Sequence, residues 1–243
     1  MDVAGVDLLC LDAGNTVIFF DHGRLADLIR EATGLTVSAD ILVRTEGEAK
    51  RLAETGALHD DLAWVGRDRP GAVGWGRMVG TIALLAGVPA SSIGALLASA
   101  WSVHVARNLW CRVPDGLGAA LDAARATGVR TAIISNSEGM LEGLFRDLGI
   151  RDHFDLVVDS GKLGIEKPDP RIFQVALDRF GVPPARALHL GDVFATDVLG
   201  ARAAGLRHAL IDPFQHYAGR HAEVPRVPGV VAVAEALLRA TRA

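Results

Sequence analysis

Hydrophobic and polar residues follow two different patterns along this chain. A short apolar run at residues 5–11 ends at the turn-forming residues 12–16, which predicts a buried strand followed by a tight turn. No strand pattern follows for about ninety residues. The periodicity there favours helices, with a loop at 60–74, and the helices are expected at 25–33, 38–54, 75–86 and 92–107.

Beyond residue 113, short strands and helices alternate. Strands are predicted at 130–134, 156–158, 187–190 and 208–211. Helices are predicted at 115–127, 138–148, 170–180 and 196–204, and residues 223–230 are expected to form a surface connection before a last helix. This alternation indicates right-handed βαβ units, and therefore an α/β fold with a Rossmann-like parallel sheet.

The first strand has no neighbouring strand in the sequence. A single strand is not stable alone, so this strand must join the later sheet. Residues 1–19 and 110–243 are therefore expected to form the Rossmann-like core, with residues 20–109 inserted as a helical domain. The chain passes twice between these parts, and we expect hinge strands near 18–24 and 108–114.

Composition excludes several classes of protein. The formal net charge is −4 and no long run of like charges occurs, which argues against a nucleic-acid partner. Residues 79–103 carry no charge, but Pro89 and two following serines interrupt them, so two buried helices are predicted and no membrane association. Cys10 and Cys111 are too few for a disulfide framework, and the N-terminus has no basic region, so we expect a cytoplasmic protein.

Lysine is rare among the 25 basic residues, being found only at Lys50, Lys162 and Lys167. A chain that uses Arg for general positive charge can keep Lys where a compact point charge is needed. Lys50 has charged neighbours and Glu46 four residues before it, so it is predicted to lie on a solvated helix face.

Polar side chains follow four of the predicted strands. In open parallel sheets, ligands bind at the carboxyl ends of the strands. Each group alone has a simpler explanation, for example Ser135 or Asn136 as a helix cap. Four strand ends carrying suitable groups together predict a catalytic site made of Asp12 and Thr16, Ser135 and Asn136, Lys167, and Asp192 with Asp197.

The ordered motifs Asp-x-x-x-Thr, Ser-Asn, Lys-Pro-Asp-Pro and Gly-Asp-x-x-x-x-Asp resemble those of the haloacid dehalogenase superfamily, most of whose members are magnesium-dependent phosphatases. The resemblance covers nearly the whole chain, and the insertion is similar to the helical cap of this family. It implies that Asp12 is a nucleophile that becomes an aspartyl phosphate. It also implies that Thr16, Ser135 and Lys167 bind the phosphoryl group, assisted by the backbone amides near Gly14 and Asn136. Asp197 would orient Lys167 or a metal-bound water, and Asp12, Asp192 and the Gly14 carbonyl would bind Mg²⁺.

One position departs from the family pattern. Phosphatases of the family usually carry a second aspartate two residues after the nucleophile, which protonates the leaving group, and here that residue is Gly14. A positioned general acid typically contributes about 10²- to 10⁴-fold in rate. Asp21, His22, His59 or Asp60 of the insertion could replace it, or the substrate could have a leaving group that needs no proton.

Three functions therefore stay open. The first is a magnesium-dependent hydrolase of a small phosphorylated metabolite, working as a monomer or homodimer. The second is a phosphonatase or a 2-haloacid dehalogenase, whose leaving groups need no such acid, although dehalogenases lack a carboxylate at the position of Asp192. The third is a protein that binds a phosphorylated ligand or partner without turnover, which would have no need of the Asp12 nucleophile.

Overall fold

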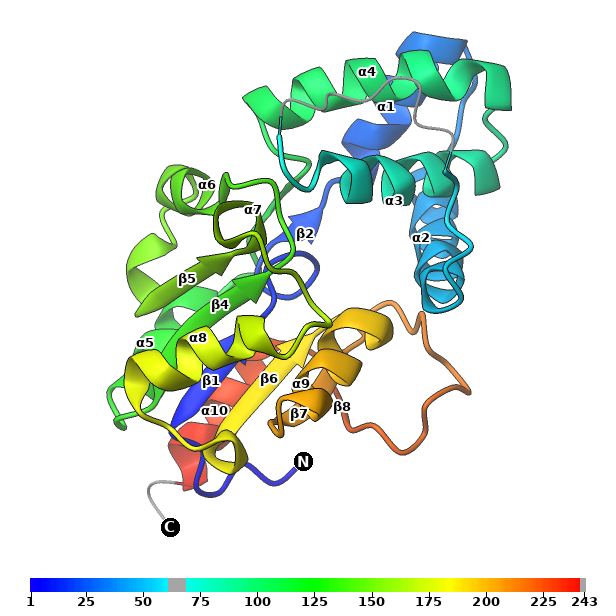
Figure 1. Cartoon of the computed structure of the whole chain (residues 1–243). Coiled ribbons are helices and arrows are strands. Elements are labelled where there is room, and N and C mark those ends of the chain that lie inside the picture. The colour runs from blue at the N-terminus through cyan, green and yellow to red at the C-terminus, as the bar shows by residue number, and fades with distance from the viewer. Residues whose placement is uncertain (61–68, 241–243) are drawn as a thin grey trace. The chain divides into compact units, whose positions relative to one another are not determined.

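The computed structural model describes residues 1–60 and 69–240, which form two units (Figure 1). The core unit comprises Met1–Phe19 and Val113–Ala243, and the helical unit comprises Phe20–Arg112. The second boundary thus falls three residues after the position expected from the sequence. Residues 61–68 of the expected loop at 60–74 lie outside the described residues.

A six-stranded parallel sheet forms the centre of the core unit, as the α/β prediction required. Its strand order is β5-β4-β1-β6-β7-β8, and all its neighbouring strands pair in parallel. The strands are β1 (Leu8–Leu11), β4 (Arg130–Ser135), β5 (Leu156–Asp159), β6 (Ala187–Gly191), β7 (Arg207–Ile211) and β8 (Arg226–Val227). The first strand does join the sheet, between β4 and β6, and its four residues are 0% exposed because both of its faces are covered.

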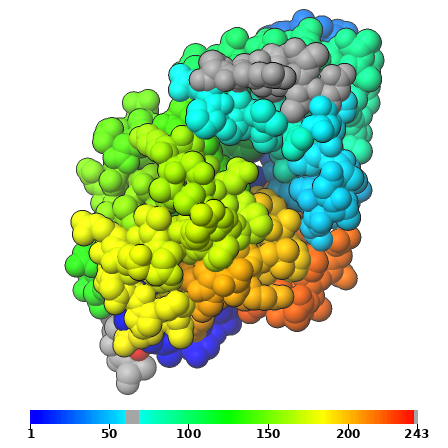
Figure 2. Space-filling view, in the orientation of Figure 1, coloured from blue at the N-terminus to red at the C-terminus, as the bar shows by residue number. Residues whose placement is uncertain are grey.

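Helices cover both faces of this sheet. One face carries α8 (Arg171–Phe180) and α9 (Leu199–Ala203), and its core joins β1 to both helices through Cys10, Phe173 and Ala201. In Figure 2, α8 belongs to the yellow part of the surface and α9 to the golden-orange part beside it. The other helices of the core unit are α5 (Leu117–Arg125), α6 (Leu141–Asp147), α7 (Ser160–Leu163) and α10 (Val230–Ala240).

Two segments of the core unit differ from the prediction. The segment predicted as a surface connection contains β8, which pairs with the end of β7, and a two-residue strand is too short to show an alternating pattern. The helix predicted at 196–204 begins instead with a turn of π-helix, Phe194–Val198, before α9. Such turns often occur at functional sites, and this one carries Asp197.

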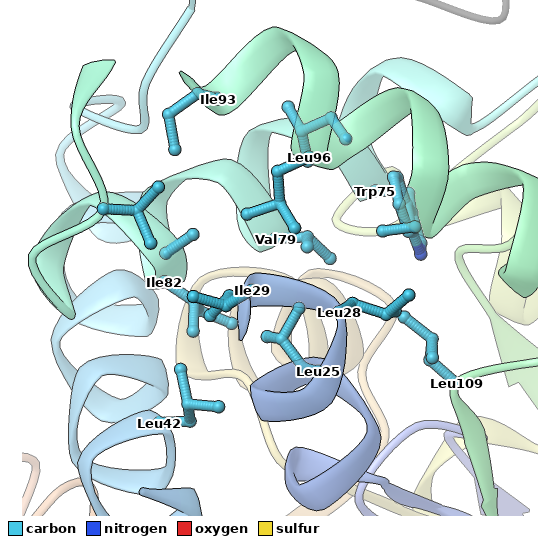
Figure 3. Packing of buried hydrophobic residues seen from close by; sticks show 14 of the residues in the cluster. Leu25, Leu28, Ile29, Leu42, Trp75, Val79, Ile82, Ile93, Leu96 and Leu109 are labelled. Carbon is cyan, nitrogen blue, oxygen red and sulfur yellow. The ribbon is translucent and has the colours of Figure 1, made fainter. Parts of the chain in front are cut away.

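The helical unit contains α1 (His22–Thr33), α2 (Ala39–Glu54), α3 (Ala72–Leu85) and α4 (Ala90–Ala106). Their apolar faces meet in a buried cluster that includes Leu25 and Ile29 of α1, Val79 of α3 and Leu96 of α4 (Figure 3). In the segments expected to be hinges, β2 (Phe19–Phe20) and β3 (Trp110–Arg112) form a two-stranded sheet. Among the described residues, no helix is long and apolar enough to cross a membrane.

The prediction that Lys50 lies on a solvated helix face is wrong. Its side chain is buried, and Nζ lies 3.4 Å from Oε1 of Glu46, the residue four positions earlier. The other oxygen of Glu46 lies 2.8 Å from Nε2 of His22, which is also buried. Burial of Lys50 and His22 is tolerated because the carboxylate of Glu46 contacts both side chains. Charged side chains are rarely buried in proteins unless they are paired in this way.

Candidate active site

The predicted catalytic residues of the core unit lie at the carboxyl edge of the sheet. Asp12 follows β1, Ser135 ends β4, and Asp192 follows β6. Lys167 lies between α7 and α8, and Asp197 lies in the π-helical turn. All five side chains belong to buried residues, with exposures from 1% for Asp197 to 8% for Asp12. Ionisable groups are seldom buried unless they are paired, so their placement indicates a functional site.

Lys167 lies between two carboxylates. Its Nζ donates hydrogen bonds to Oδ1 of Asp12 and to Oδ1 of Asp197, both at 2.6 Å. Burial by itself lowers the pKa of this lysine, but attraction to Asp12 and Asp197 outweighs it and raises the pKa above its usual value. Lys167 is therefore a fixed cation in contact with the predicted nucleophile.

The pKa values of the two aspartates shift in opposite directions. Burial raises the pKa of the Asp12 carboxyl, and Lys167 offsets this effect only in part. Burial also acts to raise the pKa of Asp197. Attraction to Lys167 and a hydrogen bond from His189 outweigh this effect, and the pKa of Asp197 is lowered. Asp197 is thus a permanent carboxylate that anchors Lys167, whereas the protonation of Asp12 depends on the charges placed beside it.

The turn after β1 carries two more of the predicted residues. The carbonyl of Ala13 accepts hydrogen bonds from the amides of Thr16, Val17 and Ile18, and Asn15 adopts a left-handed conformation with φ 49°. Asparagine tolerates this conformation better than most residues. Thr16 is 1% exposed, and its hydroxyl oxygen has no hydrogen-bond partner among the described residues. A buried hydroxyl of this kind is suited to a ligand.

Asn136 contacts Lys167 through its side chain. Its Nδ2 donates to the carbonyl of Lys167 at 2.8 Å, and its Oδ1 accepts from the amide of Lys167 at 2.7 Å. The resemblance implied a phosphoryl contact for Asn136. The side chain holds the backbone of Lys167, which leaves the backbone amide of Asn136 for the implied contact.

Asp159 organises the loop after β4, although sequence reasoning did not single it out. Its carboxylate accepts hydrogen bonds from the Ser137 hydroxyl at 2.7 Å and from the amides of Gly139 and Leu141 at 3.0 and 3.1 Å. It also caps α7 through the amide of Gly161. An aspartate directly before a short helix is a typical N-cap, and this signal could have revealed Asp159.

Oxygen donors for a metal ion are present at this edge of the sheet. One oxygen each from Asp12, Asp192 and Asp197 can be chosen within 4.8 Å of one another. Asp197 already accepts from Lys167 and His189 with Oδ1, and from the amide of Val193 with Oδ2. The sequence assigned the metal to Asp12 and Asp192, and the hard oxygen donors of these two carboxylates fit Mg²⁺.

No acidic side chain stands two residues after Asp12, where Gly14 is found. The four residues considered as substitutes all have contacts within the helical unit. Asp21 caps α1, His22 contacts Glu46, the amide of His59 donates to Thr81, and Asp60 pairs with Arg77. The contact of His59 is made by its backbone amide alone, and a role as proton donor stays a prediction for all four residues.

The core unit thus combines a parallel-sheet α/β fold with a cluster of Asp12, Lys167 and Asp197 at the carboxyl edge of the sheet. Residues 6–205 match the model of the haloacid dehalogenase-like hydrolase family, and the chain belongs to this family. It is 37% identical over 127 residues to haloacid dehalogenase-like hydrolase domain-containing protein 3 of Mus musculus, covering 52% of this chain and 51% of the relative. The chain thus spans about half the length of the curated relatives it matches.

Two further comparisons bear on activity and fold. A phosphoserine phosphatase of Thermus thermophilus is 43% identical over 93 residues, which cover 38% of this chain and 37% of the relative. The structure of the HAD-hydrolase YfnB from Bacillus subtilis superposes with a TM-score of 0.64 and 19% identity, covering 96% of this chain and 98% of that one. The structural similarity shows that the two chains share a fold.

Proposed function

We propose that this protein is a magnesium-dependent phosphatase of a small phosphorylated metabolite, with Asp12 as nucleophile. The observation that carries the proposal is the position of Lys167, which lies 2.6 Å from both Asp12 and Asp197. A carboxylate repels an anionic phosphate, so a nucleophilic aspartate needs a cation beside it. The similarity to a phosphoserine phosphatase supports a phosphoric monoester as the substrate.

The reaction has two steps. An oxygen of Asp12 attacks phosphorus and forms the aspartyl phosphate, while the bond to the leaving group breaks and that group takes the electron pair. Water then attacks the same phosphorus, releasing inorganic phosphate and restoring the Asp12 carboxylate. Lys167, Ser135 and Thr16 would hold the phosphoryl oxygens, and the unpartnered hydroxyl of Thr16 supports its part in this set.

Magnesium would be held by the carboxylates of Asp12 and Asp192 and by the backbone carbonyl of Gly14. When bound, the ion neutralises negative charge on the phosphoryl group and on Asp12. Asp192 favours this interpretation over a metal-independent dehalogenase, because the dehalogenases that the motifs resemble lack a carboxylate at this position.

Gly14 limits the choice of substrate. Without an acidic side chain at this position, the leaving group departs without a proton from the protein. We therefore infer that acyl and aryl phosphates, whose leaving groups are stable anions, are hydrolysed faster than alkyl phosphates.

A cytoplasmic location and a monomeric or homodimeric state stay predictions from the sequence.

The test is magnesium-dependent release of a phenolate from its aryl phosphate ester. Wild type is expected to turn over and Asp12→Asn to be inactive, because an amide oxygen is a far weaker nucleophile. Asp178→Asn makes the same chemical change on the exposed surface of α8 and is expected to behave as wild type. Circular dichroism checks that all three proteins are folded.

Two results would contradict the proposal. Turnover by Asp12→Asn close to wild type would exclude Asp12 as the nucleophile. A wild type that binds magnesium but releases no phenolate would exclude the phosphatase, and phosphonate and haloacid substrates would then be assayed to separate a C–P or C–halogen hydrolase from a non-catalytic binding protein.

A further inference from the structure

His189 is a buried histidine beside the site that none of the sequence motifs includes. It lies in the middle of β6, opposite Cys10 of β1, and is 1% exposed. The phenyl ring of Phe173 on α8 packs against the imidazole in a T-shaped arrangement, with the two ring centroids 4.9 Å apart and the two ring planes at 86°. A histidine on the apolar side of a central strand is costly to bury, so its contacts need an explanation.

The polar contact of His189 is with Asp197. Its Nε2 lies 2.9 Å from Oδ1 of Asp197, the same oxygen that accepts from Lys167. An ionised carboxylate only accepts hydrogen bonds, so Nε2 carries the proton. Nδ1 has no hydrogen-bond partner among the described residues, and burial lowers the pKa of the ring although Asp197 opposes this. His189 is therefore a neutral ring with a single donor, aimed at Asp197.

The carboxylate of Asp197 is held on every side. Lys167 and His189 donate to Oδ1, and the amide of Val193 donates to Oδ2 at 2.9 Å. Gly191 leaves the space that the carboxylate fills, since a Cβ there would lie 2.5 Å from both oxygens. Of these contacts, the one from His189 is the only one made by a neutral side chain among the described residues.

We propose that His189 is a positioning residue for phosphoryl transfer: its Nε2–H orients the Asp197 carboxylate, which in turn holds Lys167 against Asp12. This inference rests on the proposed function. The reason is geometric. Oδ1 of Asp197 accepts from both Lys167 Nζ and His189 Nε2, and the same Nζ contacts Asp12, so a shift of Asp197 would also shift Lys167 relative to Asp12. Misplacement of a catalytic group by about 1 Å can cost on the order of 10²-fold in rate.

The experiment compares two substitutions of His189 in the full chain. His189→Gln keeps an N–H donor near the position of Nε2, whereas His189→Leu fills similar space without a donor. We expect kcat for the aryl phosphate to fall about 10- to 100-fold in His189→Leu with KM changed less than about threefold, and to stay within about threefold of wild type in His189→Gln.

A control separates positioning from general loss of packing. Thr131→Val removes a buried hydroxyl that donates to the carbonyl of His153 and to the carboxylate of Asp155. Thr131 lies near the amino end of β4, whereas the site lies at the carboxyl ends of the strands. This variant is expected to lower the melting temperature and leave kcat unchanged. Melting temperatures of all variants show whether His189→Leu is folded in the assay.

The outcomes distinguish this inference from the proposed function. Equal kcat in wild type, His189→Leu and His189→Gln would overturn the positioning role alone, and so would equal losses in both variants, since the donor would then not be the cause. If His189→Leu is unfolded at the assay temperature, His189→Gln is compared with His189→Asn. The side chain of Asn is too short for its N–H to reach Asp197, so this variant is expected to lose kcat. Absence of turnover in wild type would overturn the proposed function and this inference with it.

Discussion

Replacing Gly191 by alanine tests the geometry of the site most directly. The new Cβ would lie 2.5 Å from both carboxylate oxygens of Asp197, although real Cβ contacts are essentially never closer than 3.0 Å. Asp197 would have to move away from the strand. Its hydrogen bonds with Lys167, His189 and the Val193 amide cannot all survive such a shift.

The size of the effect follows from those hydrogen bonds. Bonds to charged groups contribute about 1.5–3 kcal/mol each, so losing two lowers the free energy of unfolding by about 3–6 kcal/mol. That is a large share of the roughly 5–15 kcal/mol that stabilises a typical protein. For a chain of this size it corresponds to a fall of about 6–24 °C in melting temperature.

The assay is urea unfolding followed by circular dichroism, together with the aryl phosphatase assay. Gly143→Ala is the matched control, because a Cβ at this glycine of α6 meets no atom within 4 Å. Alanine favours a helix by about 1 kcal/mol over glycine, so the control is expected to be slightly more stable than wild type. A Gly191→Ala protein with the wild-type midpoint and turnover would refute the placement of Asp197 against β6.

Two further predictions concern pH and the missing acid. Partial burial acts to raise the pKa of Asp155, but hydrogen bonds from the Thr131 amide and Arg125 outweigh it and bring the pKa below the ordinary 3.8. Asp155→Asn should therefore lower the free energy of unfolding by about 1.5–3 kcal/mol at pH 7, and the difference should disappear as the pH falls below about 3.8; urea midpoints that differ equally at pH 7 and pH 2.5 would count against this. Gly14→Asp should raise kcat on alkyl phosphates by up to about 10²- to 10⁴-fold, and no gain with unchanged magnesium affinity would mean that another group already supplies the proton.

Local pattern was enough to predict the fold class. The apolar run before Asp12 and the later alternation of strands and helices predicted a parallel sheet with the first strand in it, as observed. The reason is that a buried strand must be apolar along its whole length, and this can be recognised without knowing its neighbours. The two-residue β8 and the four-residue α7 are too short to produce such a pattern.

The sequence also predicted which residues meet at the site, because the carboxyl ends of parallel strands share one edge. It could not predict how those residues are paired. Asn136 holds the backbone of Lys167, 31 residues away, and Lys50 is buried with a carboxylate that also contacts His22.

His189 shows the limit most clearly. The sequence places His189 on a strand, two residues before Gly191. Its partner Asp197 comes within hydrogen-bond distance only because the chain turns back after β6 through a π-helical turn. Hydrogen bonds to buried charges depend on distances of a few tenths of an ångström and on which side chains share a space. Hydrophobic periodicity carries no such information, so the elements follow from the sequence, whereas the pairing of the charges follows from the tertiary structure.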